Sequence, residues 1–146
     1  MALYDLKSDL TLAVGINATL SGTTPAAGNI VDLQGYAAVT FAFFTGAVTD
    51  AGTAAGFTIK LQESDTTAAA DFADVAAADH TGDLTVTSDD DDVAPVGMIG
   101  YTGQKRYVRA VVTGTSGTNA VISGAAILGK ADYGPADDIA ANIAAT

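Results

Sequence analysis

Residues 36–45 read Y-A-A-V-T-F-A-F-F-T, a segment rich in the aromatic and β-branched side chains that favour β-strands. Successive side chains of a strand point to opposite faces. Val39, Phe41 and Phe43 therefore share one face, while Phe44 points to the other. We expect this stretch to be the central strand of the core.

The same two-residue alternation recurs along the chain. In residues 9–16, D-L-T-L-A-V-G-I, every second residue from Leu10 to Ile16 is apolar, which predicts a strand with one apolar face. Further strands are expected at residues 57–62, 83–87, 105–113 and 118–128, and an edge or irregular strand at 93–99. Because both faces of residues 118–128 are apolar or small, we expect that strand to be buried on both sides.

Segments rich in Gly, Ser and Thr separate these strands. Loops are expected at residues 17–29 and 46–56, and a short hairpin loop at 114–117. Six or more short strands without a convincing long helix indicate one all-β domain over residues 9–130, a β-sandwich or jelly roll. Residues 1–8 and 131–146 are expected to be extended N- and C-terminal arms.

The composition excludes several classes of partner and site. The 146 residues include 6 Lys and Arg against 17 Asp and Glu, a net charge of -11, so no basic patch for nucleic acid or for an anionic membrane is expected. The chain has no cysteine, which rules out disulfides and thiolate metal sites. No signal peptide or bilayer-spanning stretch is recognisable, so we expect synthesis in a host cytoplasm.

Residues that suggest chemistry have simpler explanations. The run D-D-D-D at residues 89–92 lacks the spacing and the central Gly of a calcium loop, and a solvated loop tip is expected. The sequence contains no Gly-x-Ser-x-Gly motif that would pair His80, the single histidine, with a catalytic serine. His80 is therefore expected to be exposed in a loop. Glu63 and Asp65 are expected to form a turn rather than a glycosidase pair. We expect no catalytic site, no metal and no cofactor.

Half of the positive charge lies in one segment, at Lys105, Arg106 and Arg109. Two roles are open for these side chains. They could form ion pairs with an acidic partner or a neighbouring subunit, or they could pair with aspartates of this chain.

Five short motifs follow one another in a defined order. They are F-x-I-x-L-Q-E-S-D at 57–65, D-F-x-D-V at 71–75, V-G-x-I-G at 96–100, K-R-Y-V-R at 105–109 and A-I-L-G at 126–129. From about residue 28 to 130 the chain thereby resembles small virion structural proteins of tailed phages, of the capsid decoration (cement) type. The segment Gly100-Tyr101-Thr102-Gly103 departs slightly from the spacing of that family.

The resemblance implies a structural protein without catalytic residues. Such proteins sit as trimers or dimers on the outer capsid surface of the virion and clamp neighbouring copies of the major capsid protein. A rigid β body with two arms suits this role, because many weak contacts add up over many copies. The expected contact residues are Leu3, Tyr4, Leu6, Lys105, Arg106, Arg109, Tyr133, Ile139 and Ile143.

Two other functions remain open from the sequence. One is a tail or head–tail junction component of the same particle. The other is a carbohydrate-binding module for adsorption, which the absence of Trp and the presence of only 5 Tyr disfavour.

Overall fold

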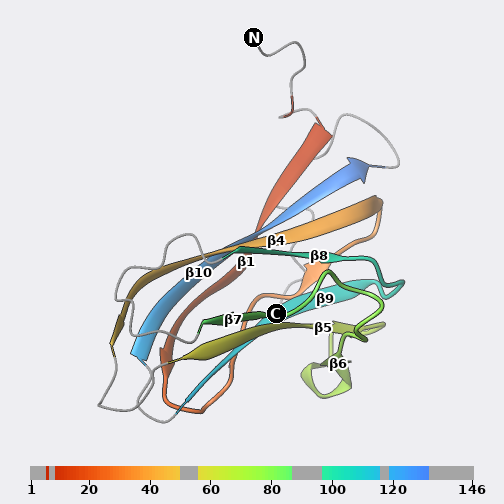
Figure 1. Ribbon diagram of the computed structural model, residues 1–146. Helices are drawn as coiled ribbons and strands as arrows, with labels where there is room; N and C mark the ends of the chain where they lie inside the picture. The colour runs from red at the N-terminus through yellow and green to blue at the C-terminus, as the bar shows by residue number, and fades with distance from the viewer. Residues whose placement is uncertain (1–5, 7–8, 50–55, 87–96, 116–118, 132–146) are drawn as a thin grey trace.

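The computed structural model describes residues 6, 9–49, 56–86, 97–115 and 119–131. Two antiparallel sheets pack face to face, which confirms the predicted all-β sandwich (Figure 1). Sheet A contains, in spatial order, β1 (Leu10–Ser21), β10 (Asn119–Ala131), β4 (Tyr36–Thr49) and β8 (Gly97–Tyr101). Sheet B contains β2 (Ala26–Ala27), β9 (Tyr107–Gly114), β5 (Phe57–Ser64) and β6 (Ala73–Asp74), with β3 (Val31–Asp32) beside β9 and β7 (Leu84–Val86) beside β5. A short 3-10 turn, η2 (Ala69–Asp71), precedes β6.

The strands pair as in one long hairpin that has been rolled up. The first strand, β1, pairs with the last, β10. Moving inward along the chain from both ends, β2 and β3 pair with β9, and β4 pairs with β8. In the middle of the chain β5 pairs with β6 and β7. Successive pairs fall alternately in sheet A and sheet B, and the β10–β4 and β9–β5 pairings complete the two sheets. This order is the jelly-roll arrangement of two Greek keys.

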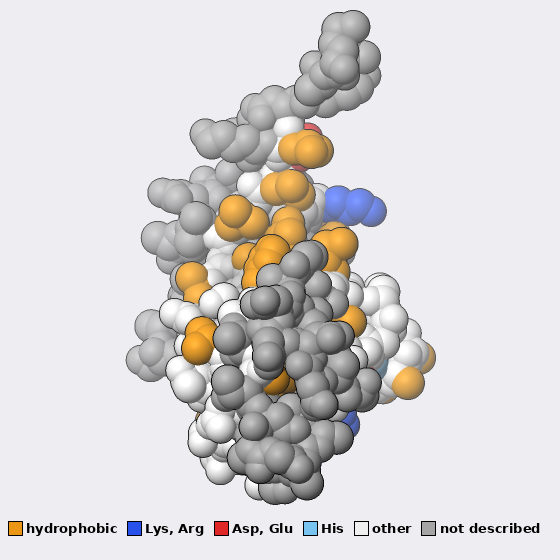
Figure 2. Space-filling view, turned by 60° about the vertical axis from the view of Figure 1, so that its left-hand side comes forward, with side chains coloured by type: hydrophobic (Ala, Val, Ile, Leu, Met, Phe, Trp, Pro, Cys, Tyr) orange, Lys and Arg blue, Asp and Glu red, His pale blue; other side chains and the backbone are white. Residues whose placement is uncertain are grey.

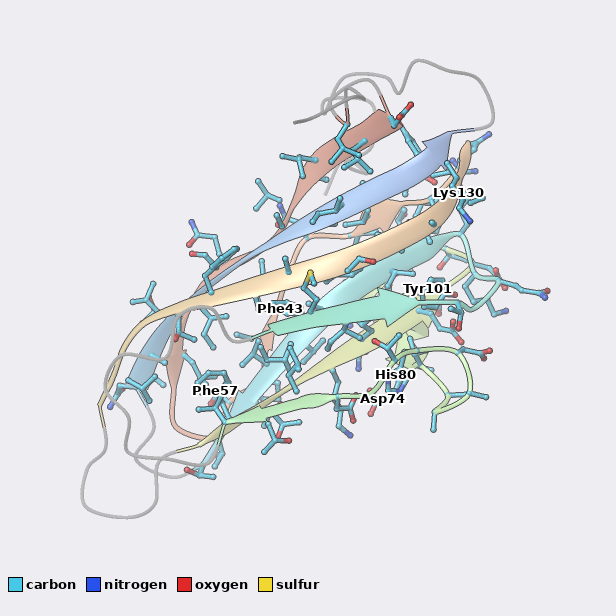
Figure 3. The ribbon with its side chains drawn as sticks, turned by 45° about the horizontal axis from the view of Figure 1, so that its top comes forward. Phe43, Phe57, Asp74, His80, Tyr101 and Lys130 are labelled. Carbon is cyan, nitrogen blue, oxygen red and sulfur yellow. The ribbon has the colours of Figure 1, made fainter. Side chains whose placement is uncertain are left out.

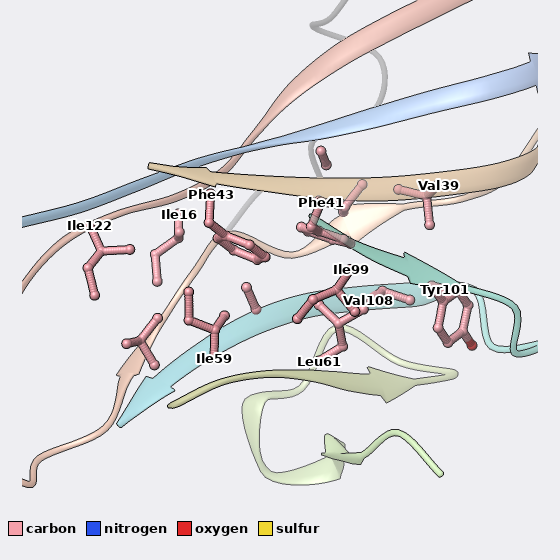
Figure 4. Close-up of a cluster of buried hydrophobic side chains, with 14 of the residues drawn as sticks. Ile16, Val39, Phe41, Phe43, Ile59, Leu61, Ile99, Tyr101, Val108 and Ile122 are labelled. Carbon is pink, nitrogen blue, oxygen red and sulfur yellow. The ribbon is translucent and has the colours of Figure 1, made fainter. Parts of the chain in front are cut away.

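The predicted central strand lies where the alternation placed it. Phe41 and Phe43 of β4 are fully buried with their rings stacked at 6.3 Å, whereas Phe44 is exposed on the opposite face. They share one core with Ile59 and Leu61 of sheet B, as Figure 4 shows. The core therefore lies between the two sheets and is built from alternate residues of each strand.

The apolar face predicted for residues 9–16 is wrong in one respect. A register shift between Val14 and Ile16, at Gly15, makes a β-bulge in β1 opposite β10. A bulge changes which face the following side chains occupy. Ile16 therefore lies in the core, while Leu10, Leu12 and Val14 point outward and are exposed.

The strands also extend further than the sequence indicated. β1 continues to Ser21 and β4 to Thr49, so the loops expected over residues 17–29 and 46–56 begin several residues too early. In β1 the continuation contains Leu20, whose side chain is buried in the core. Small and polar residues thus continue a strand when the strands beside them supply the hydrogen bonds.

Two expectations about the last strands are wrong. Residues 114–117 do not close a hairpin, because β9 belongs to sheet B and β10 to sheet A. β10 is central within its sheet but is not buried on both faces, since Val121 on its outer side is 48% exposed. The expected edge strand at 93–99 is represented by β8, whereas residues 93–96 lie outside the described residues.

We predict that Gly124→Ala destabilises the fold by about 1–3 kcal/mol, because overpacking a filled core has a cost of that order. A Cβ at Gly124 would lie 2.7 Å from Cδ1 of Phe43 and 3.1 Å from the carbonyl oxygen of Ala42. The matched control is Gly46→Ala in the same sheet, where the new Cβ would lie 3.8 Å from Cβ of Val121. Chemical denaturation of both variants measures the difference, and equal stabilities would contradict the packing described here.

Candidate functional site

A groove of about 760 Å³ lies at one end of the sandwich. It is lined by the segment from Leu33 to Val39, by the segment from Tyr101 to Arg106, and by Asp65 and Lys130. Figure 3 shows Tyr101 and Lys130 at this end of the molecule. Three of the six cationic side chains of the chain, those of Lys105, Arg106 and Lys130, line the groove. We call this region the basic end.

Tyr101 anchors the loop that follows β8. Its hydroxyl donates a hydrogen bond to Oε2 of Glu63, at 2.6 Å, and accepts one from the backbone N–H of Lys105, at 2.9 Å. Burial, together with the Glu63 carboxylate, raises the pKa of Tyr101 well above its usual range, so the phenol stays protonated. A Cβ at Gly103 would lie within 2.6 Å of the Tyr101 ring, so glycine is needed there.

Arg106 is held by Asp32 in a bidentate ion pair. Its Nε donates to Oδ1 of Asp32 at 2.9 Å and its terminal nitrogen donates to Oδ2 at 2.7 Å. Burial raises the pKa of Asp32, but the hydrogen bonds from Arg106 and from the Gln34 amide outweigh burial and hold that pKa below its usual value. The guanidinium also lies over the Tyr107 ring, at 4.9 Å from its centre.

The other two cations singled out from the sequence are also paired within the chain. Lys105 forms an ion pair with Asp65. Arg109 lies outside the groove, on the outer side of sheet B, where it donates to Oε1 of Gln62 at 2.8 and 3.0 Å and stacks over Phe72 at 4.2 Å from the ring centre. Lys105 and Arg106 thus pair with aspartates of this chain, whereas Arg109 binds Gln62 and Phe72. A contact of these cations with a partner stays a prediction.

Lys130 is the cation of the groove that has no acidic partner among the described residues. It lies at the end of β10 with a left-handed φ of 53° and an exposed side chain. Leu10 at the start of β1 is paired with Gly129, so the chain enters β1 and leaves β10 on neighbouring strands. The two segments predicted to be arms therefore join the sandwich side by side at the basic end.

Most of the predicted contact residues of the arms lie outside the described residues, namely Leu3, Tyr4, Tyr133, Ile139 and Ile143. Leu6 is described and is 67% exposed. Its carbonyl accepts a hydrogen bond from the backbone N–H of Asp9, at 3.1 Å. The contact role of these residues stays a prediction.

The predictions for His80 and Glu63 need correction. The side chain of His80 is only 8% exposed, because its Nδ1 accepts a hydrogen bond from the Gly82 amide and its backbone bridges to Tyr101. Glu63 lies within β5 and binds the Tyr101 hydroxyl, so it does not form a turn. Both residues support the loops around β8.

Within the described residues, no three His, Asp or Glu side chains come together as a metal site. The aspartate run at residues 89–92 lies outside the described residues, and its predicted role as a loop tip stays a prediction. No helix among the described segments is long and apolar enough to cross a membrane.

A second groove, of about 650 Å³, lies on the outer side of sheet B. Its lining includes the polar side chains of Thr58, Lys60, Gln62 and Asp74, and Asp74 accepts hydrogen bonds from both Lys60 and Gln62. Phe57, an aromatic lining residue, is only 2% exposed and offers no ring for stacking against a sugar. The groove therefore gives little support to the carbohydrate-binding alternative.

The outer face of sheet A is apolar, a feature that the sequence did not predict. Large exposed hydrophobic side chains gather there, from β1, β4, β8 and β10: Leu10, Leu12, Val14, Phe44, Met98 and Val121. Figure 2 shows hydrophobic side chains collected along this side of the molecule. The alternation of residues 9–16 predicts one apolar face, but that pattern does not show the bulge at Gly15, which places Leu12 and Ile16 on opposite faces.

No protein-family model matches the chain. No curated protein sequence matches it either. Among solved structures, the PBSX exported protein XepA superposes with a TM-score of 0.53 at 15% identity, over 84% of this chain and 38% of that one. The chain thus spans well under half the length of XepA, and the likeness shows a shared fold.

Other solved structures are more distant. PirA gives a TM-score of 0.38 at 10% identity, over 78% of this chain and 91% of that one. The structure of infectious bursal disease virus, Gx strain, gives 0.37 at 10% identity, over 84% of this chain and 32% of that one. TM-scores this low do not establish a shared fold.

We predict that Asp32→Asn lowers stability at neutral pH and flattens the loss of stability in acid. The folded-state pKa of Asp32 lies below 3.8, so its contribution is present above that pH and is lost as the pH falls through the folded pKa. Thermal unfolding of both proteins from neutral pH to acid measures the effect.

Arg106→Gln should reduce the loss of stability at acid pH in the same way, because it removes the hydrogen bonds that lower the pKa of Asp32. If Asp32→Asn kept the pH dependence of the unchanged protein, the Asp32–Arg106 pair would not stabilise this end of the fold.

Proposed function

We propose that this chain is a structural protein of a virus particle, a decoration or cement protein that binds the outside of a capsid and stabilises it. The proposal needs a rigid body, a region that contacts the shell and no chemistry. The jelly-roll sandwich supplies the rigid body. Because one fold serves many functions, the surface and not the fold supports this role.

The basic end is the observation that carries the proposal. Three of six cations line one groove, in a chain whose net charge is -11. Leu10 and Gly129, paired on neighbouring strands, join the body to the segments before β1 and after β10. We infer that these segments and the groove contact the major capsid protein together.

The pairing within the basic end suits a repeated, moderate contact. Lys105 and Arg106 are fixed by Asp65 and Asp32, so they shape the groove and add little free charge. Lys130 remains for a carboxylate of the partner. A single exposed ion pair contributes less than about 1 kcal/mol, and tight attachment would come from many copies on one particle.

The same features also suit a tail or head–tail junction component, which is the second candidate. Both are assembly roles, and the sequence motifs at 57–65 and 105–109 favour the capsid role by their resemblance to decoration proteins. In either role the chain is a structural component and not an enzyme.

Binding of the purified chain to particles that lack it tests the proposal. We expect co-sedimentation with the particles, weakened at least several-fold by Lys130→Gln and abolished by removal of residues 1–8, with the β structure retained in circular dichroism. The matched control is Lys60→Gln, which removes one cation from the outer side of sheet B and should bind like the unchanged chain. Failure of the unchanged chain to bind, or equal binding by all four proteins, would overturn the proposal.

A further inference from the structure

The outer face of sheet A is unusual for a surface that meets water. Among the described residues, six of the seven large hydrophobic side chains that are exposed belong to this face, and the seventh, Leu6, precedes β1. Single exposed hydrophobic side chains are normal, whereas a contiguous group marks an interaction surface. From this face we propose that the chain forms a twofold dimer in which sheet A of one copy packs on sheet A of a second copy.

The strand register makes the face continuous. Val14 lies opposite Ala125, which lies opposite Ala42, which lies opposite Met98, so one row crosses all four strands without a polar side chain. The next row contains Leu12, Ile127, Thr40 and Gly100. Apolar residues on neighbouring strands therefore form one patch over these two rows, whereas the row of Phe44 also carries the polar side chains of Asn17 and Ser123.

The patch has a shape that can fit its own copy. Leu10, Leu12 and Val14 form a ridge along the edge strand β1. Beside it, Ala125 and Ala42 on β10 and β4 make a lower strip. A twofold axis through the face lets the ridge of each copy rest on the strip of the other, since the same patch is used on both sides.

Charge decides the occupant. Among the described residues of β1, β10, β4 and β8, the single charged side chain is that of Lys130, which lies at the end of β10 and lines the groove of the basic end. The outer side of sheet B carries Lys60, Asp74 and Arg109. With a net charge of -11, two copies repel each other through most of their surface, and this face is where they can meet without opposed like charges.

A charged partner would find no counter-charges on the outer face of sheet A. The same apolar face of a second copy is complementary to this face. A second copy is therefore the occupant that these observations favour. None of the six large apolar side chains of this face lines the groove of the basic end, although Leu10 lies beside it on β1. The dimer does not depend on the particle role.

Light scattering after size exclusion tests the dimer. We expect a mass of twice 14.5 kDa for the unchanged chain and a monomer for Leu12→Lys, with at least a tenfold rise in the dissociation constant and an unchanged circular dichroism spectrum. Thr113→Lys, on the exposed outer side of sheet B, is the matched control and should remain a dimer. A monomeric unchanged chain at micromolar concentration would overturn the inference.

Spin labels test which face is used, and they do not need a disrupted variant. The chain has no cysteine, so a single cysteine at Thr19 or at Thr113 gives one label per copy. We expect a shorter distance between the two labels at Thr19, on the outer face of sheet A, than between those at Thr113. The reverse order, or no measurable distance at either site, would contradict the inference.

The two proposals fail separately. A dimer that does not bind particles overturns the decoration role alone, and a monomer that binds particles overturns the dimer alone.

Discussion

The burial of β4 against sheet B holds the rest of the structure in place. Phe41 and Phe43 fill the middle of the core, and β10 and β8 pair with the two edges of their strand. A hairpin rolled into two sheets is stable only if each sheet buries one face, because the hydrophobic contribution scales with the area removed from water. Every strand is thereby given an inner side and an outer side.

This constraint separates what builds the fold from what is available for function. The inner sides consist of alternate apolar residues, whereas the outer sides of the two sheets differ strongly from each other. Sheet B presents the paired polar side chains of Lys60, Asp74 and Arg109 to solvent. Sheet A presents Leu12, Val14 and other apolar residues that nothing in one copy covers within the described part of the chain. A domain with one polar and one apolar outer face is suited to assembly.

The basic end provides a second surface for such an assembly. Tyr101, Glu63 and Gly103 fix the loop after β8, and Asp32 fixes Arg106, so the groove is a rigid part of the body. Both segments that flank the described strands join the sandwich at this end. The large apolar side chains of the proposed dimer face do not line the groove, and the two surfaces meet at Leu10.

The sequence predicted the strands well because their alternation depends on local burial. Val39, Phe41 and Phe43 share a buried face as expected, and β5 includes the strand predicted at residues 57–62. It did not predict what depends on distant neighbours. Two features are set by pairing across the fold: the bulge at Gly15, which places Leu12 and Ile16 on opposite faces, and the separation of β9 and β10 into different sheets.

Similar reasons explain the site. The segment from Lys105 to Arg109 was singled out for its charge, but its partners Asp32 and Gln62 are 74 and 47 residues away from Arg106 and Arg109. Lys130 gave no signal in the sequence, because its place in the groove follows from the end of β10 beside β4. The exposed apolar face was visible in residues 9–16 but could not be told from a core face without the register.

The most direct test of the structural role is the number of copies of this chain in purified virus particles, measured by quantitative mass spectrometry together with image reconstruction of the shell. The account predicts hundreds of copies, all on the outer capsid surface, because decoration follows the capsid lattice. About a dozen copies at one vertex would instead make the chain a junction or tail component, and its absence from particles would contradict the virion role altogether.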